Sequence, residues 1–395
     1  MTHSTSRFTL LSIATALFSI TTVAHPIDSV LSAVENNNLT LKALSSDIKA
    51  QIHESKSANN LSETSVQYSP FYADGVSGVA SSELVVSQDF DFPTLYAARN
   101  KASKMKNEEL DKRFLLERRN ILLDARQLCL DIIHTYKRQA LLNKRMEIAD
   151  NLLRLYEKRM ENGDATILEF NKVKMERMEL NAEAEELQAT LISAQSQLTA
   201  INGNNPIRFA ATDYPPMAPL PDDATLISQY LASDAEILVA EAETKNTQQN
   251  INISKQNWLP KLTVGYRRNT NLDEAVNGFL VGAAIPLFSN RHKTKEARAM
   301  HESQLLKLED TRNQNASAAQ SMIAELRHTE NAMKAYDVNL METTLQLLGK
   351  AVEVGQISSI DYFREADIIN ANMTKYLDLE NQYHKSVSEI LKNRQ

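Results

Sequence analysis

Two eight-residue stretches, Asn162-Gly-Asp-Ala-Thr-Ile-Leu-Glu169 and Val354-Gly-Gln-Ile-Ser-Ser-Ile-Asp361, lie 192 positions apart in this chain of 395 residues. Each places one glycine between two long segments rich in Ala, Leu, Glu, Gln, Lys and Met, which are residues that favour helices. Glycine weakens a helix and often ends one. We therefore expect two long helical hairpins whose tips lie near Gly163 and Gly355.

The segments on either side of these glycines have the length of rods. No proline occurs in residues 94–205 or 287–395. Residues 94–162 alone would extend about 100 Å as a helix, at 1.5 Å per residue. Apolar residues recur every seven positions, as in Ala319, Leu326, Met333, Leu340, Leu347 and Val354. This period predicts antiparallel coiled-coil packing.

The expected helix lengths indicate how the hairpins are built. Continuous helices are predicted over residues 27–62, 94–162, 164–202, 222–257, 289–354 and 356–393. In each half, two shorter helices together match the length of the long one. We expect each long helix to be flanked by two shorter helices stacked end to end.

Four short segments between the helices alternate apolar and polar residues. They cover residues 63–73, 79–90, 258–269 and 278–287. Alternation over about ten residues suits a tilted strand of an outer-membrane barrel, while a soluble four-stranded sheet remains an alternative. Four strands do not close a barrel, so three chains would have to pool twelve. The candidates for an aromatic girdle are Tyr68, Tyr72, Trp258, Tyr266 and Phe279.

The order of these elements predicts a duplicated chain behind an export signal. Residues 1–24 read as a signal peptide, with a short apolar run and small residues before a cleavage site after Ala24. Residues 25–205 form a first repeat of helix, strand pair and long hairpin. A proline-rich linker at 206–221 precedes a second repeat at 222–395.

Composition argues against several other classes of protein. The net charge is −7 with no basic block, so nucleic acid is not an expected partner. The single cysteine, Cys129, excludes an internal disulfide and suggests a buried apolar residue. The histidines are scattered without ligand spacing, and no nucleophile or phosphate-loop motif occurs. We expect no catalysis, no cofactor and no metal site.

Taken together, these features resemble the outer membrane efflux (TolC) family. The most specific pieces are the two tip stretches with Leu259-Pro-Lys-Leu-Thr-Val264 and Ile285-Pro-Leu-Phe288. The resemblance implies a mainly α homotrimer with transmembrane β structure, in which a coiled-coil helical barrel continues into a 12-stranded β-barrel. It also implies an outer-membrane location reaching into the periplasm. The implied partners are a periplasmic adaptor (membrane fusion) protein and an inner-membrane pump of the resistance-nodulation-division type or an ABC transporter.

The resemblance also assigns roles to residues at the hairpin tips. Asp361 matches an acidic position at the family's periplasmic entrance, Arg364 departs from a second acidic position, and Glu169 is the corresponding acid of the first half. The alternative for both acids is helix stabilisation, because carboxylates in a first turn offset the helix dipole. The residues expected to dock the adaptor are Asn162, Gly163, Asp164, Val354, Gly355 and Gln356.

The leading functional hypothesis is a passive exit duct for small molecules or metal ions, with energy supplied by an inner-membrane partner. A type I secretion duct is one alternative. A trimeric coiled-coil adhesin or periplasmic scaffold without a transport role is another.

Overall fold

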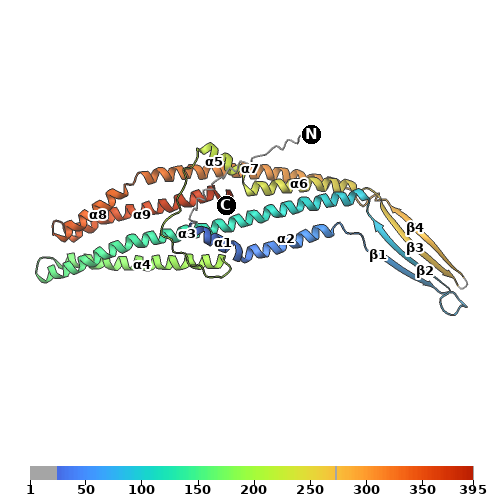
Figure 1. Ribbon diagram of the computed structural model, residues 1–395, viewed down its shortest axis with the longest axis horizontal. Coiled ribbons are helices and arrows are strands. Elements are labelled where there is room, and N and C mark those ends of the chain that lie inside the picture. Colours follow the sequence, from blue (N-terminus) through green and yellow to red (C-terminus); the bar gives the residue numbers. More distant parts are fainter. Residues whose placement is uncertain (1–24, 272–273, 395) are drawn as a thin grey trace, which may run out of the picture.

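The computed structural model describes residues 25–271 and 274–394 of a long rod. The two hairpin tips lie at one end of the rod and the strands at the other (Figure 1). The signal peptide expected at residues 1–24 lies outside the described residues.

The first half of the chain is organised around one very long helix. Helix α3 (Pro93–Glu161) has 69 residues, within one position of the expected bounds. Helices α1 (Pro26–Asn37) and α2 (Leu39–Ser57) follow one another along its part nearer the strands. Helix α4 (Ile167–Ile201) packs beside the other part. The expected end-to-end arrangement of two shorter helices along the long one is therefore confirmed in this half.

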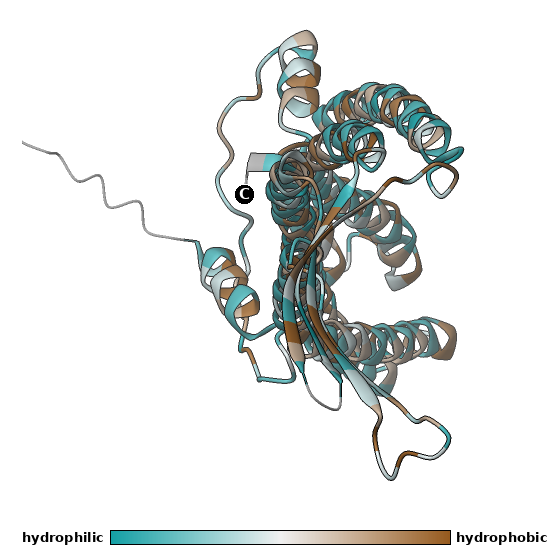
Figure 2. Cartoon of the chain, turned by 90° about the vertical axis from the view of Figure 1, so that its right-hand side faces the viewer, coloured by the Kyte–Doolittle hydropathy of each residue, from teal (hydrophilic) through white to brown (hydrophobic). Residues whose placement is uncertain are grey.

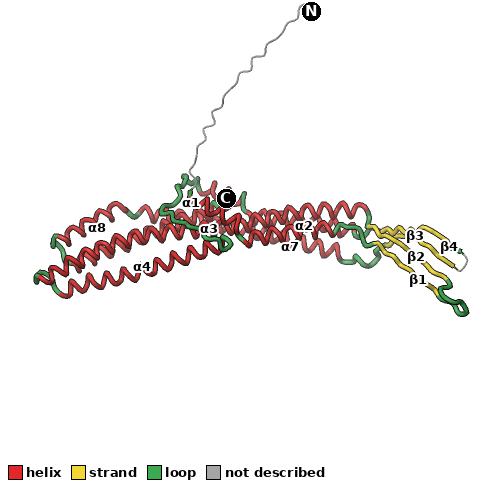
Figure 3. The backbone as a smooth tube through the Cα atoms, turned by 60° about the horizontal axis from the view of Figure 1, so that its bottom comes forward, coloured by secondary structure: helices red, strands yellow, loops and turns green. Residues whose placement is uncertain are grey.

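The second half repeats this element order with more interruptions. Helices α5 (Asp223–Ala232) and α6 (Ala235–Gln256) pack against α7 (Lys293–Lys334). Helix α8 (Val338–Glu353) then leads to the second tip, and α9 (Ser359–Ile390) returns alongside it. A short 3₁₀ helix, η1 (Lys392–Arg394), follows. Helix α3 also contacts α6 and α9, so the two halves pack on each other along the rod (Figure 3).

Three helices that the sequence predicted as continuous are each broken into two. The predictions over 27–62, 222–257 and 289–354 were wrong at Asn38, Asp234 and Asp337. In each case the side-chain oxygen accepts a hydrogen bond from the backbone of the next helix, as at Leu41 N (2.9 Å). Asn and Asp cap helix starts in this way without any glycine or proline.

Two of these breaks are anchored to a neighbouring helix. Asn38 is buried and donates to the carbonyl of Ile201 at the end of α4 (2.7 Å). Asp234 is also buried and accepts from the amide of Asn315 on α7 (2.8 Å). Hydrogen bonds at these two helix breaks therefore fix the shorter helices relative to α4 and α7.

The third break changes which residues of the heptad stripe are buried. Ala319 and Leu326 on α7 are buried as expected. Leu340 and Leu347 on α8, and Val354 directly after it, are 61–70% exposed, so the residues of the seven-residue repeat are not all buried within this chain. The helix ends at Lys334 and restarts at Val338, so the stripe does not keep its direction across the break.

The strands form one antiparallel sheet in the order β1-β2-β3-β4. Their bounds are β1 (Thr64–Phe71), β2 (Ser81–Phe90), β3 (Lys261–Asn271) and β4 (Ala275–Ala284). All four segments predicted as strands are strands, although the last begins three residues earlier than expected. Pairing of β2 with β3 joins the halves, which leaves β1 and β4 as the edges of the sheet within the described residues.

The main apolar core lies at the middle of the rod. Residues of α1, α3 and α4 meet there, including Val34, Ile133 and Leu198. Cys129 belongs to this core and is fully buried, which raises the pKa of its thiol to about 12. The expectation that Cys129 is a buried apolar residue is confirmed.

Candidate functional site

The first hairpin tip is a helix end closed by a left-handed glycine. Gly163 has a φ of +78° and follows the last residues of α3. Its N–H donates to Met160 O (3.1 Å), and Asp164 N–H donates to Arg159 O (2.7 Å). This pair of hydrogen bonds is the Schellman motif, which favours glycine because a side chain is strained at positive φ.

The second tip repeats this arrangement at the end of α8. Gly355 has a φ of +79°. Its N–H donates to Val352 O (3.2 Å), and Gln356 N–H donates to Ala351 O (2.9 Å). The two glycines that the sequence placed at hairpin tips therefore reverse the chain by the same backbone geometry.

The acids expected near the entrance begin the returning helices. The Glu169 carboxylate accepts from the N–H and hydroxyl of Thr166 (both 2.9 Å), while Glu169 N–H donates to that hydroxyl, in a capping box. The Asp361 carboxylate accepts from the Ser358 hydroxyl (2.8 Å), whose oxygen accepts from Asp361 N–H (3.0 Å). Both acids thus make the helix-stabilising contacts that are the alternative to a role at the entrance.

Asp361 also contacts the residue that departs from the family pattern. Arg364 Nη2 lies 3.2 Å from Asp361 Oδ1, and its Nε lies 3.2 Å from Glu365. All three side chains are at least half exposed. Exposed ion pairs of this kind contribute about 0–1 kcal/mol, so the cluster is easily rearranged.

The structure brings the three predicted entrance residues into one cleft between the tips. This tip cleft has a volume of about 550 Å³. Glu169, Asp361 and Arg364 line it, together with the expected docking residues Asp164, Gly355 and Gln356. Of the other docking candidates, Asn162 caps α3 and Gly163 follows it, while Val354 is 70% exposed at the tip of α8. Residues 192 positions apart along the chain, such as Glu169 and Asp361, therefore share one surface.

Arg159, which was not predicted from the sequence as a site residue, joins the two tips. Its Nη2 donates to the main-chain carbonyl of Glu353 (2.9 Å), and its guanidinium lies over the Tyr156 ring at 5.2 Å. On the other side, the buried Ser359 hydroxyl donates to Glu169 O (3.3 Å). A basic residue in the last turn before Gly163 was a visible signal, because such residues bond to free helix-end carbonyls.

An apolar cluster beneath the cleft holds the four tip helices together. Val173 of α4 and Val352 of α8 are fully buried in it. Tyr156, Tyr362 and Phe363 fill the space between them, and burial raises the pKa of Tyr362 to about 12. The tips are therefore supported by packing and linked by only a few polar contacts.

At the other end of the rod, one face of the sheet is apolar and exposed. Cross-strand pairing places Val66 beside Val86, and Tyr266 beside Phe279. We call this the exposed sheet face, which consists of Val66, Tyr68, Leu262, Val264, Tyr266, Phe279 and Val281, each 38–92% exposed. Brown, hydrophobic stretches run along the strands in Figure 2.

The five aromatic candidates are all exposed but do not lie at one level. Tyr68, Tyr266 and Phe279 lie within strands of the exposed sheet face. Tyr72 follows the far end of β1, and Trp258 precedes β3 near the helices. The aromatic side chains therefore spread along the length of the sheet.

The opposite face of the sheet is polar and carries paired charges. Glu83 on β2 forms an ion pair with Arg267 on β3. Thr263 donates a hydrogen bond of 2.5 Å to Asp89. The sheet is thus apolar on one side and polar on the other, as the alternation predicted.

Within the described ranges, no helix is both long and apolar enough to cross a membrane.

Comparison with known proteins relates the chain to solved structures. No protein-family model matches the sequence, and no curated protein matches it. The fold matches CusC, whose crystal structures concern folding and transmembrane channel formation. The TM-score is 0.77 and the sequence identity is 15%, and the match covers 93% of this chain and 92% of CusC. It also matches the CmeC outer membrane channel of Campylobacter jejuni (TM-score 0.71, 12% identity, 93% and 85% covered). A third match is the outer membrane protein VceC of Vibrio cholerae (TM-score 0.72, 14% identity, 93% and 96% covered). The chain has the fold of the TolC-type outer-membrane efflux channels, as the sequence resemblance predicted.

Proposed function

We propose that this chain is one subunit of a homotrimeric outer-membrane channel that serves as the exit duct of an efflux system. The observation that carries the proposal is the exposed sheet face. An apolar patch of this kind on a single chain marks a surface that lipid or another protein covers. The likeness in fold to solved outer membrane channels supports lipid as the cover.

The free strand edges support assembly from several copies. Unpaired backbone groups are not tolerated in lipid, so β1 and β4 need partner strands. Three copies would supply twelve strands and pair each β1 with the β4 of a neighbour, which leaves no edge. The polar face with Glu83 and Arg267 would then line the interior, as in membrane barrels. Removal of residues 1–24 during export and a duplicated origin of the two halves are part of the same proposal.

The helical end of the rod would form the periplasmic entrance. The tips are exposed and lie farthest from the sheet, where a periplasmic adaptor would reach them (Figure 1). Such a channel has no energy source of its own, so an inner-membrane pump would drive transport. Opening would separate the two hairpins near the tip cleft, which are linked there by the Arg159–Glu353 hydrogen bond and by the hydrogen bond from Ser359 to the Glu169 carbonyl.

Disulfide cross-linking tests the shared barrel. Gln67→Cys on β1 is combined in turn with Val276→Cys, Gly278→Cys or Leu280→Cys on β4. These positions share the polar face, according to the strand register. At least one combination should give dimers and closed trimers on non-reducing gels of isolated outer membranes. The native Cys129 is buried and does not interfere.

A matched control places the second cysteine on the other face. Gln67→Cys with Phe279→Cys should give no cross-link, because adjacent β4 residues point to opposite faces. Absence of trimers in every same-face combination would contradict the barrel.

Conductance separates a duct from a scaffold. The purified protein should conduct ions in planar bilayers and fractionate with the outer membrane. A coiled-coil adhesin or periplasmic scaffold predicts no conductance, and that result would overturn the proposed function.

A further inference from the structure

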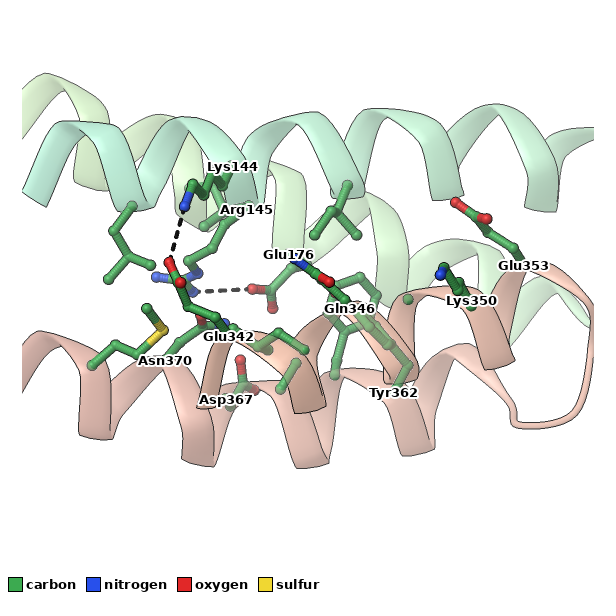
Figure 4. Close-up of a pocket in the computed structure, with 18 residues that line it drawn as sticks. Lys144, Arg145, Glu176, Glu342, Gln346, Lys350, Glu353, Tyr362, Asp367 and Asn370 are labelled. Atoms are coloured by element: carbon green, nitrogen blue, oxygen red, sulfur yellow. Dashed lines mark hydrogen bonds and ion pairs between the residues drawn. The ribbon is translucent and has the colours of Figure 1, made fainter. Parts of the chain in front are cut away.

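A second cavity, separate from the tip cleft, lies between the two hairpins farther along the rod. This inter-hairpin cavity has a volume of about 460 Å³ and is lined by residues of α3, α4, α8 and α9 (Figure 4). It shares no lining residue with the tip cleft. Cavities of roughly 300–1,000 Å³ accommodate small organic ligands.

Much of its wall is apolar. The apolar lining residues come from all four helices: Leu141, Ile148, Leu180, Leu345, Tyr362, Phe363, Ala366 and Met373. An apolar wall with a few fixed polar groups is the usual composition of a small-molecule site.

One buried polar group in the wall has no partner. Asn370 on α9 is only 8% exposed, and its Oδ1 accepts no hydrogen bond from any residue in the described ranges. A buried acceptor without a donor has a free-energy cost, because it has lost its hydrogen bonds to water and gained none in the protein. Asn370 lines the cavity, but its Oδ1 lies buried beneath the cavity surface. A ligand in the cavity could donate a hydrogen bond to this oxygen once the Asn370 amide turns toward it, and that bond would remove the cost.

Acidic groups lie beside the unpartnered oxygen. Asp367 is three residues before Asn370 on α9, so both side chains lie on one face of the helix. Across the cavity, Glu176 of α4 is 5% exposed, and burial together with the nearby Asp367 raises its pKa. In Figure 4, Asp367 and Asn370 lie on α9, and Glu176 and Arg145 face them from α4 and α3.

The basic residues of the cavity wall do not form an ion pair with Asp367 or a hydrogen bond with Asn370 Oδ1. Arg145 is shared between Glu176 (3.4 Å) and Glu183 (3.0 Å). Lys144 pairs with Glu342 (3.2 Å). Lys350 lies at the other end of the cavity, beside Glu353 on the same helix (Figure 4). Asp367 has no ion-pair partner among the residues that the structure describes, so it and Asn370 Oδ1 are the acceptors left for a ligand.

We propose that the inter-hairpin cavity binds a small amphipathic organic cation, whose ammonium group donates to Asn370 Oδ1 and Asp367 while its apolar body packs on Phe363 and the aliphatic wall. The ligand would contact both hairpins at once. Its binding therefore stabilises the arrangement in which α3 and α4 lie against α8 and α9.

Three probes of similar size and different charge test the chemistry. 4-Phenylbutylamine, 4-phenylbutanol and 4-phenylbutyrate are titrated by calorimetry into the purified full-length protein in detergent. The amine should bind once per chain and at least tenfold more tightly than the alcohol, because a charged donor forms a stronger hydrogen bond than a neutral one. The carboxylate should bind more weakly than the alcohol.

Two variants locate the site. Asp367→Asn removes one negative charge from an exposed position and should weaken amine binding about tenfold while leaving the alcohol unchanged. Gly349→Leu should abolish binding of both, because a Cβ on this helical glycine meets no atom within 4 Å and the side chain would occupy the cavity. Asp111→Asn, on an exposed part of α3 that does not line the cavity, is the matched control and should bind as the unmodified protein does.

Several results would overturn the proposal. They are equal affinity for amine and alcohol, no binding of the amine, or an affinity that neither Asp367→Asn nor Gly349→Leu changes. If a neighbouring copy fills the cavity in the assembled protein, the amine will not bind. Circular dichroism of each variant shows whether it is folded, and the two variants report independently.

Discussion

Arg159 donates a hydrogen bond of 2.9 Å to the carbonyl oxygen of Glu353, and this bond joins the tips of two hairpins that are 194 residues apart in sequence. The carbonyl belongs to the last turn of α8, where no further helical N–H is available to it. One side chain therefore closes the end of a helix and also links the two tips.

Replacing Arg159 by Met should loosen the second tip. The loss of one charge-assisted hydrogen bond at a half-exposed site corresponds to about 1 kcal/mol, or roughly a fivefold change in local opening. Hydrogen exchange of the Gly355 and Gln356 amides, measured by mass spectrometry, should accelerate by that factor. Lys158→Met is the control, because it removes a neighbouring exposed positive charge. Equal exchange in both variants would argue against the link.

Asp361 and Arg364 test whether the tip cleft closes the entrance. If they do so in the assembled channel, Asp361→Ala combined with Arg364→Ala should raise single-channel conductance in planar bilayers. Ser358→Ala separates gating from capping, because it removes the cap contact of Asp361 and costs about 1 kcal/mol of stability while keeping the ion pair. Unchanged conductance in the double variant would leave Asp361 with a capping role alone.

Two glycines of the second hairpin should respond in opposite ways to alanine. Gly355→Ala places a Cβ at a φ of +79° and 3.4 Å from Arg159 Nη2, so it should destabilise the protein by about 1 kcal/mol. Gly349→Ala lies within α8 with open space around its Cβ, and should stabilise it by roughly 0.5–1 kcal/mol. Urea denaturation midpoints compare the two directly, and a shift of the same sign in both would contradict the backbone argument.

The burial of His384 should make the stability of the protein sensitive to acid. Its ring stacks on Tyr214 of the proline-rich segment at 4.1 Å, and burial together with Lys137 lowers its pKa to about 4. Asp131, Asp378 and Glu380 lie nearby in ion pairs with Lys385, His134 and Lys137. An unfolded histidine has a pKa of about 6.5, so the unfolded state binds a proton that the folded state excludes between these values.

The free energy of unfolding should therefore fall as the pH drops from about 6.5 to 4. Above about pH 6.5, His384 should make no pH-dependent contribution to the free energy of unfolding. His384→Gln should flatten that dependence in thermal unfolding scans at several pH values. His328→Gln, at an exposed position on α7, is the control and should keep the slope of the unmodified protein. A His384→Gln profile as steep as the original would show that other groups cause the acid effect.

Local sequence patterns predicted most of the secondary structure. Gly163 and Gly355 marked the tips because only glycine adopts their positive φ without strain. The alternation in 63–73 and 258–269 marked strands and their apolar face. The helix breaks were missed, because Asn38, Asp234 and Asp337 cap helices with side chains that also occur on ordinary helix surfaces.

The sequence by itself determined the two hairpin tips and the positions of the four strands, since these depend on residues a few positions apart. It also determined which side of each strand is apolar. Only the tertiary structure decided that Glu169, Asp361 and Arg364 share one cleft, that Arg159 reaches the second tip, and that Asn370 lines a cavity while its Oδ1 has no donor among the described residues. Those relationships join residues far apart in the chain, and they depend on how the two hairpins pack against each other.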